Sequence, residues 1–314
     1  MLAIIVCTFT FLIIEFICYM LILALVEILV GLCLGYKFVS FSFAGLMIRN
    51  DNNKISFEIV PIRFLAMTIL IRKEVNGKTK LIKGTSEFLI MTVLTILSLY
   101  IWHVISLDNI YLRYIDKTLI LCLVFHGILF MDTVKKFFSK GHEHYIWEQE
   151  IKISNQLKNG IRPNQINLID LNMDSNDFTE KKCILYNYFI LLDNKKYDEL
   201  LPYIEKFEQY IGTRNNIIAS DFPYAFEIIY YYSMVNNDIK KAEHYVTLLG
   251  DVLKNDMDLN GRRVYAGYLI GTGKPKELIM KVFEQCKSYN LNDSSKIIAT
   301  MEYDLISQLK ENYL

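Results

Sequence analysis

Residues 2–36, LAIIVCTFTFLIIEFICYMLILALVEILVGLCLGY, decide the fold of this chain. The stretch has no lysine or arginine and only two charged residues, Glu15 and Glu27. A helix needs about 20 apolar residues to cross the hydrocarbon core of a bilayer, so this stretch is long enough to span it. A cleaved signal peptide would instead have a basic start and a small-residue cleavage site. We therefore predict one long membrane-spanning helix, which at roughly 50 Å must tilt or protrude.

Two further apolar runs predict two more spans, at 88–106 and 117–131. The loop between the first two spans, at 37–83, is rich in lysine and arginine, whereas the short loop after the second span is not. Because basic loops stay in the cytoplasm, the 37–83 loop and everything after the third span should be cytoplasmic. The sequence thus predicts a multi-pass protein of the cell membrane, in contact with membrane lipid, whose C-terminal domain is cytoplasmic.

The basic loop opens with a strand-like pattern. Polar and apolar residues alternate within 36–48 (YKFVSFSFAGLMI), and they alternate again at 55–59 after the polar turn RNDNNK. This pattern predicts a β-hairpin over 36–60, ended by Pro61. Two interpretations of the hairpin stay open. It is either a structural element without a binding role, or its edge pairs with an extended peptide, which joins the sheet as an added strand. The candidate peptide-binding residues are Phe41, Phe43, Ile55 and Phe57.

After Lys140 the composition becomes that of a soluble helical domain. Three helix-turn-helix units are visible, at 183–207, 227–249 and 262–285, and apolar residues recur at the same offsets in the second helix of each unit. Those offsets place the apolar residues on one face of the helix. The units resemble a degenerate tetratricopeptide-type array, whose stacked repeats often bind a peptide or protein partner. The recurring residues are Leu200, Ala242 and Leu278, followed by Ile204, Val246 and Val282.

These patterns together predict a mainly α fold in three parts. A helical membrane domain with a cytoplasmic β-hairpin occupies residues 1–135, and a linker follows at 136–176. A soluble α-helical repeat-like domain occupies residues 177–314.

The order of parts in residues 1–135 resembles the site-2 protease family of intramembrane zinc metalloproteases. The resemblance lies in a long first span carrying Glu27, the exit LGYKFVSFSF, a hairpin, two later spans and Asp132. That family places a His-Glu-x-x-His motif in its first span and takes a third ligand, an aspartate, from a later span. The segment QLKNGIRPNQINL at 156–168 also looks like the linker of bacterial members with a helical tail. The resemblance places Glu27 and Asp132 at motif positions.

The motif itself is altered, because both histidine positions hold valine, at Val26 and Val30. Two histidines at i and i+4 grip zinc from one helix face, and the glutamate acts as general base. Valine has no lone pair for a metal, and two carboxylates do not complete the usual three-ligand site. Losing both imidazoles should abolish zinc-dependent hydrolysis. We therefore expect Glu27 and Asp132 to be vestigial, with no cofactor and no catalysis.

One histidine offers an alternative. His126 precedes Asp132 by six residues and is a metal-ligand candidate, although a hydrogen-bonded histidine within a span is the favoured interpretation. The alternative function is an active intramembrane metalloprotease that processes a peptide through an unconventional zinc site made of Glu27, His126 and Asp132. A third hypothesis is a membrane-tethered interaction protein whose spans are only anchors.

Charge and motifs narrow the function further. The 34 lysine and arginine residues balance 34 acidic ones, which removes the basic surface typical of a nucleic-acid partner. The sequence has no GxSxG nucleophile elbow and no GxxxxGK[ST] phosphate loop. We expect a catalytically inactive site-2-protease-like membrane protein that binds a peptide or protein partner. A role in regulation, in handling small secreted peptides or in protection against them is implied by the family resemblance alone.

Overall fold

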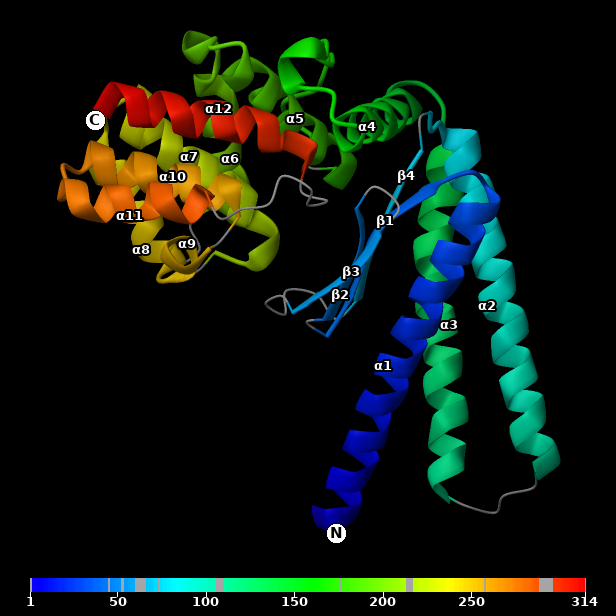
Figure 1. Ribbon diagram of the computed structural model, residues 1–314. Helices are drawn as coiled ribbons and strands as arrows, with labels where there is room; N and C mark the ends of the chain where they lie inside the picture. Colours follow the sequence, from blue (N-terminus) through cyan, green and yellow to red (C-terminus); the bar gives the residue numbers. More distant parts are fainter. Residues whose placement is uncertain are drawn as a thin grey trace. The chain divides into compact units, whose positions relative to one another are not determined.

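The computed structural model describes residues 2–44, 46–51, 54–59, 66–72, 74–105, 110–175, 177–212, 217–256, 258–287 and 296–313. In this part of the chain the protein is mainly α, with twelve α-helices and one four-stranded antiparallel sheet (Figure 1). The chain divides into two compact units, Met1–Asn155 and Gln156–Leu314. The predicted mainly α class with a small β-structure is confirmed at this level.

Three long helices form the body of the first unit. They are α1 (Leu2–Cys33), α2 (Gly77–Ile105) and α3 (Ile110–Phe138), and they pack lengthwise against one another (Figure 1). Between them lies a small apolar core in which α1 contributes one face, since its buried residues recur at helical spacing. The core residues are Tyr19, Val26, Val30, Met91 and Cys122.

Two of these helices are long and apolar enough to cross a membrane, judged by length and composition over the described residues. The qualifying segments are Phe16–Cys33 in α1 and Gly77–Tyr100 in α2. The predicted third span, 117–131, lies within α3, and its first residues fall outside the described side chains. The side chain of Glu15 falls outside them as well.

Helix α1 ends in a Schellman motif at the predicted exit from the membrane. The N–H of Tyr36 donates to the carbonyl of Gly31 at 2.9 Å, and the N–H of Gly35 donates to the carbonyl of Leu32 at 3.0 Å. Gly35 adopts φ +80°, a conformation that glycine reaches without a Cβ penalty. The glycine therefore stops the helix and turns the chain into the first strand.

The sheet is larger than the predicted hairpin. Its strands are β1 (Lys37–Phe43), β2 (Leu46–Asp51), β3 (Lys54–Ile59) and β4 (Ala66–Ile71), in the order β3-β2-β1-β4. The prediction of one strand through 36–48 was wrong, because the chain reverses at Ala44, which has φ +48°. The predicted turn within RNDNNK is confirmed, because β2 and β3 form an antiparallel hairpin in which Asp51 pairs with Lys54. Residues 36–60 nevertheless contain three strands in place of the predicted two. The predicted end of the hairpin at Pro61 lies outside the described residues.

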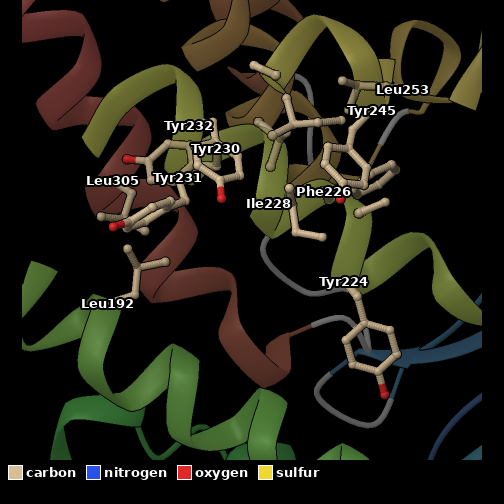
Figure 2. Close-up of a cluster of buried hydrophobic side chains, with 14 of the residues drawn as sticks. Leu192, Tyr224, Phe226, Ile228, Tyr230, Tyr231, Tyr232, Tyr245, Leu253 and Leu305 are labelled. Carbon is tan, nitrogen blue, oxygen red and sulfur yellow. The ribbon is translucent and has the colours of Figure 1, made fainter. Parts of the chain in front are cut away.

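The second unit contains helices in the three predicted pairs. The pairs are α5 with α6, α7 with α8, and α10 with α11, and α7 continues into a π-helical turn at Tyr231–Val235. The helices pack around one core rich in tyrosine, which Figure 2 shows in part. The bounds are α5 (Phe178–Asp193), α6 (Leu201–Ile211), α7 (Phe222–Tyr230), α8 (Ile239–Leu249), α9 (Val252–Asn255), α10 (Leu259–Gly271), α11 (Lys276–Lys287) and α12 (Lys296–Tyr313).

The predicted linker, 136–176, is divided between the two units. Its first part forms most of α4 (His142–Lys158), where Glu148 accepts a hydrogen bond from the N–H of Gly77 at 3.1 Å. In its later part, the Asn187 side chain accepts a hydrogen bond from the N–H of Ile169 at 2.9 Å and donates to its carbonyl at 2.8 Å. Each part of this segment is thus held by its own unit.

Candidate functional site

Val26 and Val30 lie on the face of α1 that packs against α2 and α3. Val26 and Val30 are one helical turn apart, and each is 5% exposed. They pack with Tyr19, Met91 and Cys122, and the Tyr19 hydroxyl donates to the Cys122 carbonyl at 3.3 Å. Both valines are therefore apolar core side chains of the three-helix packing.

Glu27, between these valines, is held by a lysine. Its Oε1 lies 2.8 Å from Nζ of Lys83 on α2, and the same Nζ lies 2.7 Å from Oε1 of Glu87. One ammonium thus bridges two carboxylates across the α1–α2 contact. An ion pair that is only partly exposed to water is screened less than a surface pair. Glu27 is consequently paired with a cation that the chain itself supplies.

The position of this pair follows from the lengths of the helices. Glu27 is six residues before the end of α1, and Lys83 is six residues after the start of α2. At a rise of 1.5 Å per residue, both lie about 9 Å inside the ends of their helices. The two side chains therefore meet at the same level because α1 and α2 run antiparallel.

Asp132 and His126 have different partners. Asp132 is exposed near the end of α3, and its carboxylate lies 2.9 Å from Nζ of Lys136. His126 is half-buried, and its ring stacks on Phe88 with 6.0 Å between the ring centroids. Six residues on a helix correspond to about 600° of rotation, so the two side chains lie on different faces. The structure does not bring Glu27, His126 and Asp132 together.

The described residues contain no group of three or more histidine, cysteine, aspartate or glutamate side chains that could hold a metal ion. The cluster that does form around Glu27 is two carboxylates on one ammonium. Sequence reasoning missed Lys83 and Glu87 as members of this cluster. Their i, i+4 spacing on one helix was the available signal, since residues four apart face each other.

The four peptide-binding candidates share one face of the sheet. Cross-strand register pairs Phe41 with Ile48 and Ile48 with Phe57, and directly opposed residues lie on the same face. Phe43 and Ile55 belong to the same face by the two-residue period of their strands. Phe41 lies in a central strand and is buried, and its ring stacks on that of Phe43.

The edge strand β3 carries the most exposed apolar side chains of this face. Ile55, Phe57 and Ile59 are 66%, 77% and 89% exposed, and Leu46 opposite Ile59 is 63% exposed. Within the sheet β3 pairs only with β2, so its outer main-chain edge carries donors and acceptors that the sheet itself does not use. An extended chain added there would gain main-chain hydrogen bonds and apolar contacts together.

Comparison of the chain with protein-family models, with curated protein sequences and with solved structures gives no match. The arguments for its function therefore come from the residues and their geometry.

Proposed function

We propose that this protein is a catalytically inactive, site-2-protease-like membrane protein that binds an extended peptide or protein segment at the edge of its sheet. The observation that carries the proposal is the exposed apolar row Ile55, Phe57 and Ile59 on the edge strand β3. Such strands are templates for the addition of another strand, and natural proteins usually protect them with charge, proline or a covering element.

The membrane location is supported by apolar side chains that face outward along the three long helices. Soluble monomers rarely expose contiguous apolar patches larger than a few hundred Å². The basic 37–83 loop favours a topology in which the sheet and the helical domain face the cytoplasm of a cell-membrane protein. Exposed members include Phe16, Leu25, Leu29, Leu89, Val93, Ile96, Leu121, Phe125 and Ile128.

The absence of zinc chemistry is supported by what occupies the motif. Val26 and Val30 pack in an apolar core, and Lys83 places a positive charge on the carboxylate that would otherwise face the metal. The alternative of an active protease requires Glu27, His126 and Asp132 at one centre, and each of these has a different neighbour. We therefore favour binding over catalysis. A role in handling small secreted peptides, in protection against them or in regulation is proposed on the family resemblance alone.

The binding proposal can be tested with a designed peptide. The probe is a fluorescent hexapeptide of alternating valine and threonine, titrated against the full-length protein in detergent. Its matched controls are two N-methylated forms of the same peptide, one methylated at residues 1, 3 and 5 and the other at residues 2, 4 and 6. N-methylation removes the main-chain donors that strand addition needs, and only one of the two sets of donors would face β3. We expect binding of the unmethylated peptide, loss of binding with one methylated form, and weakening by Phe57→Ser in the protein.

The outcomes separate the possible modes. Equal binding of all three peptides would mean that the peptide sits on apolar surface without joining the sheet, which contradicts the proposal. The variant Phe41→Ser is not a useful control, since Phe41 is buried and its loss would disturb the sheet. Lys54→Ser, on the opposite face of β3, is the matched substitution and should leave binding unchanged.

A further inference from the structure

The strand β3 forms one edge of the sheet, and β4 forms the other. At the β4 edge, Leu70 lies against Gly31 of α1. The β3 edge is the one turned away from α1 (Figure 1). In the described part of the chain, no strand pairs with β3 on its outer side. The strand addition proposed above therefore concerns β3 alone.

The main-chain groups of β3 alternate in direction. Asp51 pairs with Lys54, and two residues connect them. A pair that flanks a two-residue turn exchanges its main-chain hydrogen bonds, and along an antiparallel strand such pairs alternate with pairs that do not. Every second residue of β3 therefore turns its N–H and C=O away from the sheet. These residues are Ile55, Phe57 and Ile59, which also carry the exposed apolar side chains.

The other residues of β3 are polar and include two opposite charges. They are Lys54, which is exposed, Ser56 and Glu58. By the two-residue period of a strand, all three occupy positions on the face opposite Phe57. The acidic position follows the basic one by four residues, which is about 13 Å along a strand. A partner strand beside β3 therefore meets a basic position at one end and an acidic position at the other.

The direction of a partner strand decides the order in which it meets these charges. All the strand pairs of the sheet are antiparallel, and antiparallel pairs are slightly more stable than parallel ones. In antiparallel addition, the partner residue opposite Glu58 precedes the partner residue opposite Lys54. Opposite charges on directly opposed residues stabilise a sheet, and like charges destabilise it. The favoured partner therefore has its basic residue first.

We propose that the β3 edge selects an extended segment of a partner protein in which a basic residue precedes an acidic residue by four positions. The segment adds antiparallel to β3, with its basic residue opposite Glu58 and its acidic residue opposite Lys54. Apolar residues at alternate positions between them lie opposite Phe57 and Ile55 and continue the exposed apolar row. The inference rests on the strand addition proposed above and adds the partner's sequence chemistry to it.

The test compares three fluorescent hexapeptides with blocked ends, titrated against the full-length protein in detergent at low ionic strength. The first is Val-Lys-Val-Thr-Val-Glu, which matches the antiparallel order. Its control, Val-Glu-Val-Thr-Val-Lys, has the same composition and net charge with the two charged residues exchanged. The third is the uncharged valine–threonine peptide, which measures strand addition alone. We expect the first peptide to bind about five- to tenfold more tightly than the second, with the uncharged peptide between them, and the difference to shrink as salt is added.

Reversing the charges of the protein gives a matched variant. In Lys54→Glu with Glu58→Lys, the order of the two charged peptides should invert, a result that a misfolded sheet does not produce. Lys78→Glu, at an exposed lysine of α2, is the control and should leave the order unchanged. Equal binding of the two charged peptides, or tighter binding of the second, would overturn the proposal and leave strand addition intact. Failure of all three peptides to bind would overturn strand addition as well.

A second copy of the chain is the other candidate occupant of this edge. Light scattering of the protein in detergent measures the oligomeric state, which we expect to be the same in the wild type and in Phe57→Ser. A wild-type dimer that Phe57→Ser dissociates and that a saturating amount of the first peptide does not would place the second copy on β3 and overturn the proposal.

Discussion

Glu27 and Lys83 lie 56 residues apart in the sequence, yet their side chains join α1 to α2 with 2.8 Å between Oε1 and Nζ. In the proposed resemblance to the site-2 protease family, Glu27 takes the place of a glutamate that works beside a metal ion. Here the cation next to the glutamate is a lysine that the chain supplies itself. The same lysine holds Glu87, so its removal leaves two carboxylates without their shared cation.

We predict that Lys83→Met destabilises the first unit, Met1–Asn155, more than Glu27→Gln does, because only the first change leaves carboxylates uncompensated. The double variant should recover part of the loss, with a coupling free energy of about 1 kcal/mol, since Glu27 is partly exposed. Thermal unfolding in detergent is measured for the wild type, the two single variants and the double variant, which together form a double-mutant cycle. Lys78→Met, an exposed lysine of the same helix, is the control and should change little. Additive effects of the two changes would contradict the pairing.

Histidines in place of Val26 and Val30 should create a metal site. We predict that Val26→His with Val30→His takes up zinc, because histidines at i and i+4 on one helix present two ligands to one ion. Adding Lys83→Leu should raise the zinc retained after dialysis, since it removes a positive charge beside Glu27. Elemental mass spectrometry measures the zinc content of the wild type and of each variant. Stoichiometric zinc in the unaltered protein would contradict our account of the site.

Gly271 provides a test of packing in the helical domain. A Cβ atom there would lie 2.6 Å from the backbone carbonyl oxygen of Ser233, in the π-helical turn after α7. Because a backbone atom cannot move aside as a side chain can, Gly271→Ala should lower the free energy of unfolding by about 1–3 kcal/mol. Gly267→Ala, which would meet only the side chains of Met234 and Tyr230, should cost less. Urea unfolding followed by circular dichroism compares them, and equal costs would contradict this packing.

The buried carboxyl of Glu302 should make stability depend on pH. It faces Arg263, Glu227 and Asn260, and burial holds its pKa above the value of 4.5 that it has in the unfolded chain. The folded state therefore binds the proton more tightly, and stability is lost as the pH rises through the raised pKa. Relative to Glu302→Gln, the wild type should become more stable as the pH falls toward 5. Hydrogen exchange of α10 and α12 at several pH values measures the difference in stability between the wild type and Glu302→Gln. If the ratio of their exchange rates did not change with pH, the prediction would be contradicted.

Local patterns in the sequence accounted for the helices well. The uninterrupted apolar run of α1 depends only on neighbours within one helix, and a helix lies there. Of the three residues with matched offsets, Ala242 is buried in α8 as predicted. Leu200 is buried but immediately precedes α6, and the prediction of a buried face was wrong for Leu278, which is 39% exposed on α11. The sheet was harder to predict. Polar and apolar residues alternate in the same way before and after a turn, so the alternation did not show that the chain reverses at Ala44. The only local signal of this turn is the glycine that follows Ala44 in the sequence. The apolar run of β4 reads equally well as helix or strand.

Contacts between distant segments were beyond sequence reasoning. Lys83 was counted only as one charge of a basic loop, whereas its partner on α1 depends on how two helices meet. The pairing of Arg162 with Asp304 joins residues 142 positions apart, and no periodicity within either segment indicates it. The apolar surroundings of Val26 and Val30 likewise depend on how the three helices pack, and no pattern within α1 shows them.

The sheet begins and ends at neighbouring points. Lys37, the first residue of β1, pairs directly with Ile71, the last residue of β4, so the chain leaves the sheet within about 5 Å of where it entered. When the two ends of an inserted segment lie close together, its length can change without changing the distance between the elements before and after it. The far edge of the sheet, around the β2–β3 turn, can therefore be lengthened, shortened or replaced while α1 and α2 keep their spacing.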